Sequence, residues 1–205
     1  MKHYRYLALG DSYTIGEDVP FEANFPSQLV SAISAAEPLS CQQLQVIATT
    51  GWTTDELLKG IEEANPEGSF ELVSLLIGVN NQYRGYPREQ YIQEFQLLLK
   101  QAISFAGENP EKVIVVAIPD YGCTPFGASK AAEIHADLLW YNAEAKRQAE
   151  GAGAAFADIF PVSRLAAEQP ELTASDKLHP SAAMYARWVE IILPCALRIL
   201  KGMNA

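Results

Sequence analysis

The residue types that would do chemistry in this chain are a serine, a histidine and an aspartate. A serine hydroxyl is a nucleophile when a nearby base takes its proton, and at neutral pH that base is usually a histidine oriented by a carboxylate. His179 meets this condition because it lies in a loop three residues after Asp176, so one turn of chain can bring the carboxylate against the imidazole. With Ser12 as nucleophile, His179 as base and Asp176 as the orienting acid, the set predicts acyl transfer.

The other two histidines fit this role less well. His3 precedes the first apolar run and should lie at the wrong end of a sheet, and His135 lies in a long helical segment whose exposed face would accommodate it. Asp120, after a later apolar run, is an alternative acid, although an aspartate before a Tyr-Gly turn is more often structural. His179 with Asp176 is therefore the favoured pair.

Acyl transfer also needs hydrogen-bond donors aimed at the oxyanion that forms on the substrate carbonyl. Gly51 has no side chain, so its backbone N–H can approach a substrate closely, and Asn80 ends in an amide. Together with the backbone N–H of Ser12 they would make an oxyanion hole of three donors. This reaction needs no metal and no cofactor, and the chain contains neither of the glycine-rich motifs that bind phosphate groups.

The elements that must position these residues alternate along the chain. Five short apolar runs have the length of buried strands: residues 4–9, 44–48, 72–77, 113–118 and 154–159. Segments with helical periodicity lie between and after them: residues 25–36, 55–64, 89–106, 130–150 and 182–200. This alternation predicts a five-stranded parallel sheet covered by helices on both faces. No linker or repeat interrupts it, so residues 1–205 are expected to form one domain.

Local signals support several helix boundaries. Thr53 followed by Glu56 forms a capping box, and Pro87 stands just before the segment 89–106. Pro194 falls inside the last helical segment, so a kink or break is expected there.

Polar residues and glycines follow these apolar runs. In open parallel sheets the ligand site lies beyond the carboxyl ends of the strands. Ser12 follows the first run, Gly51 the second and Asn80 the third, and His179 comes after the fifth. We therefore expect them to meet at one edge of the sheet.

The same residues carry a resemblance to a known family. Gly10-Asp11-Ser12, a glycine in the second block, Gly78-Val79-Asn80 and the Asp176 to His179 pair resemble, in order and spacing, the four blocks of the SGNH, or GDSL-type, hydrolases. The resemblance implies a flavodoxin-like three-layer α/β/α sandwich and an esterase, lipase, thioesterase or carbohydrate acetylesterase. It also implies the roles given above, including Gly51 and Asn80 as oxyanion donors.

The chain departs from the family pattern at several positions. Tyr13 follows the serine where an aliphatic residue is usual, and Asn81 stands where the third block often has aspartate. Val46 and Ala48 occupy the places of an asparagine and an extra glycine in the second block. The residues expected to line the substrate pocket are Tyr13, Trp52, Asn81, Tyr83 and Tyr121.

Each candidate also has a structural interpretation. A serine after a glycine is commonly a helix N-cap, and Asp176 with His179 is compatible with a surface turn. Asn80 and Asn81 are of a type common in turns, and Trp52 fits a hydrophobic core as well as a pocket wall. Because the catalytic residue types occur together and in order, the catalytic interpretation is favoured.

The composition excludes several classes of partner. Fifteen Lys and Arg against 25 Asp and Glu give a net charge of -10, and no basic run is present, so nucleic acid and anionic membranes are poor partners. No apolar stretch has the length of a membrane span or the form of a signal peptide. Three widely spaced cysteines suggest neither a disulfide framework nor a zinc site. A cytoplasmic protein is expected, with a trimmed secreted chain as the alternative.

The resulting hypothesis is a serine esterase that cleaves small carboxylic esters, with short acyl groups or acetylated sugars, through an acyl-enzyme on Ser12. The strands and helices use nearly the whole chain and leave no segment for a lid domain, which favours a small ester over a lipid. Lysophospholipase, thioesterase and acyltransferase activities of the same family are the alternatives. Outside the class, a catalytically idle flavodoxin-like binding module is the competing interpretation, and a phosphoryl receiver is disfavoured because Asn80 stands where its acceptor aspartate would be.

Overall fold

The computed structural model describes residues 2–202 and has a single five-stranded parallel sheet in that range. The strands are β1 (Lys2–Gly10), β2 (Leu39–Ala48), β3 (Leu72–Leu76), β4 (Val113–Val116) and β5 (Ala155–Ala157). Their order is β2-β1-β3-β4-β5, and every neighbouring pair is parallel. This is the flavodoxin-like order. The predicted fold class is confirmed.

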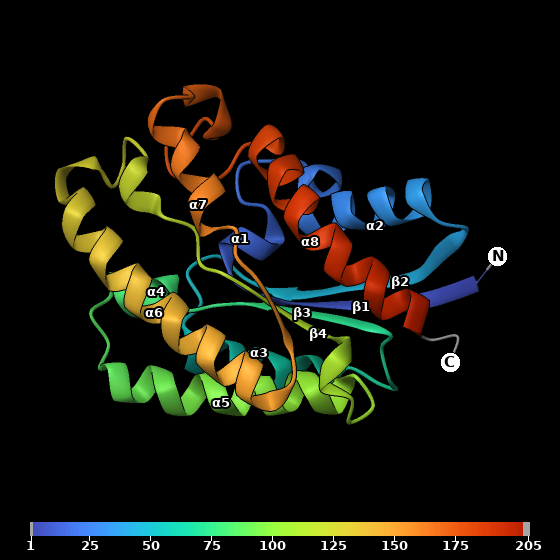
Figure 1. Cartoon of the computed structure of the whole chain (residues 1–205). Helices are drawn as coiled ribbons and strands as arrows, with labels where there is room; N and C mark the ends of the chain where they lie inside the picture. The colour runs from blue at the N-terminus through green and yellow to red at the C-terminus, as the bar shows by residue number, and fades with distance from the viewer. Residues whose placement is uncertain (1, 203–205) are drawn as a thin grey trace.

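Helices cover both faces of the sheet, as Figure 1 shows. The long helices on one face are α2 (Phe25–Ala36) and α8 (Ala182–Gly202), and those on the other are α3 (Thr54–Ala64), α5 (Arg88–Phe105) and α6 (Ala131–Ala152). β3 and β4 are buried along their whole length because both faces are covered. The result is the predicted three-layer α/β/α sandwich.

Short helical elements occupy several segments that the sequence treated as loops. The α-helical ones are α1 (Ser12–Ile15), α4 (Val79–Tyr83) and α7 (Phe160–Ser163). The 3-10 turns are η1 (Phe21–Ala23), η2 (Pro110–Lys112), η3 (Tyr121–Cys123), η4 (Ala128–Lys130), η5 (Arg164–Ala167) and η6 (Pro170–Leu172). An element of one turn is too short to show a hydrophobic period, so the sequence gives no signal for it. Figure 1 places α1, α4 and α7 at the same end of the sheet, beyond the carboxyl ends of the strands.

The edge strand β2 begins earlier than predicted, at Leu39 rather than residue 44. After the buried Leu39, residues 40–43 are mostly polar and partly or fully exposed, because β2 is an outer strand and pairs only with β1. Hydrophobic runs detect buried strands, so they miss the polar part of an edge strand.

A kink or a break was expected at Pro194, and no break occurs there, because α8 runs as one helix through that residue. Proline lacks the N–H that would bond to the carbonyl of Glu190. Both residues lie on the exposed face of α8, where water can satisfy that carbonyl. The buried face of the helix carries Trp188 and Ile192 and holds the helix against the core. No helix in residues 2–202 is long and apolar enough to cross a membrane.

Candidate active site

A cavity of about 220 Å³ opens at the carboxyl edge of the sheet. Its lining residues come from the segments after β1, β3 and β4 and from the loop before α8: Ser12, Tyr13, Val79, Asn80, Tyr83, Tyr121, Phe126, Leu178 and His179. Three of the predicted site residues, Ser12, Asn80 and His179, thus share one cavity although the chain separates them widely. A larger surface cavity of about 480 Å³, lined by Asn109, Lys112 and Arg198 among others, contains no serine or histidine.

Ser12 is the first residue of α1 and is almost fully buried. The N-cap of this helix is Asp11, whose Oδ1 accepts a hydrogen bond from the N–H of Tyr13 at 3.0 Å. The alternative in which Ser12 itself caps the helix is therefore wrong. Burial raises the pKa of Asp11 to about 7, and its Oδ2 has no hydrogen-bond partner among residues 2–202. The cap leaves the Ser12 hydroxyl free to face the cavity.

His179 and Asp176 form the pair that their spacing predicts. Nδ1 of His179 lies 2.5 Å from Oδ2 of Asp176, and Oδ1 of Asp176 accepts the backbone N–H groups of Leu178 and His179, each at 2.9 Å. Burial opposes ionisation of Asp176, but these hydrogen bonds outweigh it and lower the pKa of the carboxyl below its ordinary value. Because Nδ1 is engaged, Nε2 is the nitrogen left for proton transfer.

A second aspartate ties this loop to the segment that carries Ser12. Oδ2 of Asp18, just after α1, accepts the backbone N–H of Asp176 at 2.9 Å and the hydroxyl of Ser175 at 2.6 Å. Among residues 2–202, Ser12 makes no hydrogen bond to His179, although both line the cavity. Such contacts are often loose in a site without substrate and tighten when the substrate binds.

Asn80 is the second residue of α4, and Gly78 is the N-cap of that helix. Gly78 has φ of 126°, and a Cβ there would approach Tyr91 to 2.6 Å, so this turn requires glycine. Nδ2 of Asn80 donates to the carbonyl of Trp52 at 2.9 Å. An amide nitrogen has two hydrogens. The bond to Trp52 therefore orients the amide and leaves its second hydrogen for the cavity.

Gly51 lies in the turn between β2 and α3, where Trp52 N–H bonds to Thr49 carbonyl at 3.2 Å and Gly51 has φ of 85°. These are the marks of a type II turn, which requires a residue with positive φ at its third position. Gly51 is not among the residues that line the cavity, in contrast to Asn80. Its backbone N–H, like that of Ser12, has no hydrogen-bond acceptor among residues 2–202.

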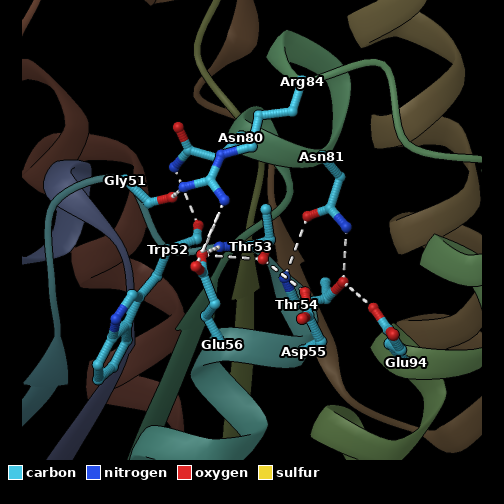
Figure 2. Close-up of polar contacts among 10 residues, drawn as sticks. All are labelled: Gly51, Trp52, Thr53, Thr54, Asp55, Glu56, Asn80, Asn81, Arg84 and Glu94. Carbon is cyan, nitrogen blue, oxygen red and sulfur yellow. Dashed lines mark hydrogen bonds and ion pairs between the residues drawn. The ribbon is translucent and has the colours of Figure 1, made fainter.

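Polar contacts join the turn that contains Gly51 to α4 (Figure 2). In the buried part, Oδ1 of Asn81 accepts the N–H of Thr54 at 3.1 Å, and its Nδ2 donates to Thr54 Oγ1 at 2.7 Å. The Thr54 hydroxyl in turn donates to Glu94 at 2.5 Å. In the exposed part, Arg84 contacts both the Gly51 carbonyl and Glu56. This arrangement fixes α4 against the start of α3.

Two residues predicted to line the pocket lie outside it. Asn81 is fully buried, and its side chain is hydrogen-bonded to Thr54. The Thr54 hydroxyl donates its proton to the Glu94 carboxylate, so it needs a donor, which the amide of Asn81 supplies. Trp52 directs its indole against Gly60, where a Cβ would come within 2.2 Å of the ring. Both side chains therefore hold the scaffold and do not face the cavity.

Aromatic side chains form much of the cavity wall. Tyr83, Tyr121 and Phe126 lie with ring centroids 6.1–6.5 Å apart, and Tyr83 and Phe126 are largely exposed. Tyr13 is buried beside His179, with ring centroids 5.6 Å apart. Tyr13, Tyr83 and Tyr121 lie where the sequence predicted them. Phe126 was missed, because a lone aromatic residue in a loop carries no signal of its own.

The sequence also missed a second histidine–carboxylate pair. Nδ1 of His135, on α6, lies 2.7 Å from Oδ2 of Asp120, and Nε of Arg164 lies 3.5 Å from the same oxygen. This pair borders a separate cavity of about 410 Å³, which Cys123 also lines but which has no serine in its lining. Asp120 is thus not the acid that holds His179. In residues 2–202, no group of three His, Cys, Asp or Glu side chains is arranged to hold a metal ion.

Comparisons with known proteins agree with the fold. The model of the GDSL-like lipase/acylhydrolase family matches residues 8–187. No curated protein sequence matches the chain.

Three similar solved structures illustrate the likeness. A lipolytic G-D-S-L family protein from Veillonella parvula DSM 2008 has a TM-score of 0.69 at 18% identity, with 96% of this chain and 98% of that chain covered. A variant of Axe2, an acetyl xylan esterase from Geobacillus stearothermophilus, has 0.68 at 20% identity, with 96% and 94% covered. A protein named TesA has 0.67 at 18% identity, with 95% and 99% covered. At these identities the likeness shows a shared fold.

Proposed function

The chain belongs to the GDSL-like lipase/acylhydrolase family, and we propose that it is a serine esterase that hydrolyses small carboxylic esters through an acyl-enzyme on Ser12. The observation that carries this proposal is the cavity shared by Ser12, Asn80 and His179, with Asp176 hydrogen-bonded to the far side of the imidazole. A nucleophile, a base with its orienting acid, and an oxyanion donor are the parts that acyl transfer needs.

The proposed cycle has two halves. Nε2 of His179 takes the proton of the Ser12 hydroxyl while Oγ attacks the ester carbonyl, and Asp176 stabilises the imidazolium that forms. The amide of Asn80 and the backbone N–H groups of Ser12 and Gly51 stabilise the oxyanion. The intermediate collapses, the C–O bond breaks, and His179 gives its proton to the leaving alcohol. Water then attacks the acyl-enzyme by the same route and releases the acid.

The size and lining of the cavity support a small substrate. A volume of about 220 Å³ has room for a short acyl group with a compact alcohol rather than a long lipid chain. Aromatic faces at its mouth favour an apolar or ring-bearing group beside the ester. The similar fold of an acetyl xylan esterase adds acetylated sugars to the candidate substrates. The net charge of -10 disfavours docking on anionic lipid surfaces.

Replacing the nucleophile tests the proposal. Ser12→Ala removes the attacking oxygen, so we expect kcat for p-nitrophenyl acetate to fall by a factor on the order of 10⁴ or more. Labelling by a fluorophosphonate probe should disappear in the same variant. The matched control is Ser31→Ala on the exposed surface of α2. The Ser31 hydroxyl donates to the Ser27 carbonyl, and this variant should react like the wild type. Wild-type turnover by Ser12→Ala would refute the acyl-enzyme.

A substrate panel then resolves the substrate class. We expect acetyl and propionyl esters to give the highest kcat/KM, and octanoyl esters and acyl thioesters to be poorer substrates. A competing alcohol acceptor in the same assay reports acyl transfer in place of hydrolysis. A preference for long acyl chains would favour the lysophospholipase or thioesterase alternative.

A further inference from the structure

Arg84 connects the two segments that carry the proposed oxyanion donors outside α1. We propose that Arg84 is a positioning residue that holds the Gly51 N–H and the Asn80 amide at a fixed separation. This inference rests on the proposed function, because it assigns those two donors to the oxyanion. Figure 2 shows the guanidinium between the Gly51 turn and Glu56, with Asn80 in α4, the helix that Arg84 follows as its C-cap.

The main chain and the side chain of Arg84 bond to the carbonyls of the two residues that carry these donors. Its backbone N–H bonds to the carbonyl of Asn80 at 2.9 Å and so closes the helical turn that begins there. Its Nη2 bonds to the carbonyl of Gly51 at 2.5 Å, while Nη1 lies 3.3 Å from Glu56 in the first turn of α3. A planar guanidinium presents several donors in fixed directions, so it can hold two acceptors at once.

The contacts of this turn fix where Gly51 lies relative to α4. The N–H of Gly51 belongs to the central peptide of the type II turn, between Thr50 and Gly51, and the turn type sets its direction. Arg84 holds the Gly51 carbonyl and Asn80 holds the Trp52 carbonyl, so both carbonyls after the central peptide are tied to α4 and the residue that follows it. The Gly51 N–H and the Asn80 amide therefore keep a fixed separation.

The position of Arg84 separates this role from folding. The buried bonds between Asn81 and Thr54 already join α4 to α3, whereas the Arg84 side chain is 38% exposed. The guanidinium of Arg84 is held by the Gly51 carbonyl and Glu56 and does not line the cavity. Removing its side chain should therefore leave the fold and substrate binding in place while loosening one oxyanion donor.

The test compares Arg84→Met with Arg88→Met. Arg88 follows four residues later and pairs with Asp137 at 2.9 Å, away from the Gly51 turn, so it controls for the loss of a partly exposed arginine. We expect Arg84→Met to lower kcat for p-nitrophenyl acetate by about tenfold to a hundredfold with KM within about twofold, since a small misplacement of a catalytic group costs rates of this order. Arg88→Met should keep wild-type kcat.

A transition-state analogue provides the second readout. Phenylboronic acid forms a tetrahedral adduct on a serine, so its inhibition constant should rise in Arg84→Met by the same factor as kcat falls. Arg84→Lys, which can still donate to the Gly51 carbonyl, should recover part of both losses. If urea denaturation shows that Arg84→Met is unfolded, Arg84→Lys is compared with Arg88→Lys instead. The kcat and the inhibition constant of each variant are then compared with those of the wild type.

Specific outcomes would overturn the inference. They are a kcat within about twofold of wild type in Arg84→Met, a rise in KM with unchanged kcat, or an equal loss in Arg88→Met. These outcomes presuppose that the wild-type protein hydrolyses the ester. A wild-type protein that neither hydrolyses it nor reacts with a fluorophosphonate instead refutes the proposed function.

Discussion

Two histidine–carboxylate pairs in this molecule have nearly the same contact but different surroundings. Nδ1 lies 2.5 Å from the carboxylate in the His179–Asp176 pair and 2.7 Å in the His135–Asp120 pair. The first is formed within one loop by residues three apart, whereas the second joins α6 to η3 across 15 residues. In each pair the carboxylate engages Nδ1 and leaves Nε2 for other partners.

The difference lies in what shares the space with each imidazole. His179 lines the cavity that also contains Ser12 and Asn80. His135 packs against Phe160, and its aspartate is also held by Arg164 and caps the N–H of Gly122 at 3.0 Å. A histidine–carboxylate pair thus does not identify an active site without a nucleophile and an oxyanion donor. The second pair instead anchors the segment that places Tyr121 in the cavity wall.

Removing each imidazole gives the largest expected contrast. His179→Ala deletes the proposed base, so kcat for p-nitrophenyl acetate should fall by about 10⁴-fold or more. His135→Ala should keep kcat within about twofold, as is usual for a substitution away from the reacting groups. Steady-state kinetics on the two variants measures this contrast. Equal losses would mean that the two pairs are not functionally distinct.

Replacing each carboxylate by its amide gives a smaller contrast of a different kind. Asp176→Asn keeps the shape but cannot stabilise the imidazolium, so kcat should fall by about 10³- to 10⁴-fold with little change in stability. Asp120→Asn leaves Arg164 and His135 without their buried anion. It should lower the free energy of unfolding by about 1–3 kcal/mol, with kcat reduced less than about tenfold. Kinetics and urea denaturation are measured on both variants. A large loss of kcat in Asp120→Asn with a loss of stability in Asp176→Asn would exchange the roles of the two pairs.

The smallest expected effect is on stability at acid pH. The pKa of Asp176 is lowered from its ordinary value of 3.8, despite burial, by hydrogen bonds from His179 and Leu178. As the pH falls, the unfolded state therefore takes up this proton before the folded state does. The contribution is present above the unfolded pKa and is lost as the pH falls through the folded pKa.

Asp176→Asn removes this linkage. We expect its free energy of unfolding to decrease less than that of the wild type between about pH 5 and about pH 3. Urea denaturation at both pH values measures the difference. The same decrease in both proteins would show that the Asp176 contacts add no acid-sensitive stability.

Most of the fold could be predicted because each main element buries a continuous apolar face. The five runs and the helical periods identify all five strands and the long helices, and α2 matches its predicted bounds, residues 25–36. The failures have local causes. The largely polar residues 40–43 of β2 pair only with β1, and Pro194 is tolerated where α8 faces solvent. Neither circumstance can be read from hydrophobic periodicity.

The parts of the candidate site that depend on contacts between residues close in sequence were the easiest to predict. Asp176 and His179 are three residues apart, so their hydrogen bond follows from one turn of loop. Ser12 and Asn80 follow strands, and the parallel topology brings them to one edge. Asn81 was misplaced because its partner Thr54 lies 27 residues away. For Trp52, only the packing of its indole against Gly60 reveals that it faces the scaffold.

The sequence by itself determined the residue types, the order of the elements and the pair formed within a single loop, because each depends on a few neighbouring residues. The tertiary structure decided which of the two imidazoles shares a cavity with a serine and that Arg84 holds the turn at Gly51. These contacts join segments tens of residues apart. They form only when the packing of helices on the sheet sets the distances between those segments, and no local pattern encodes such distances.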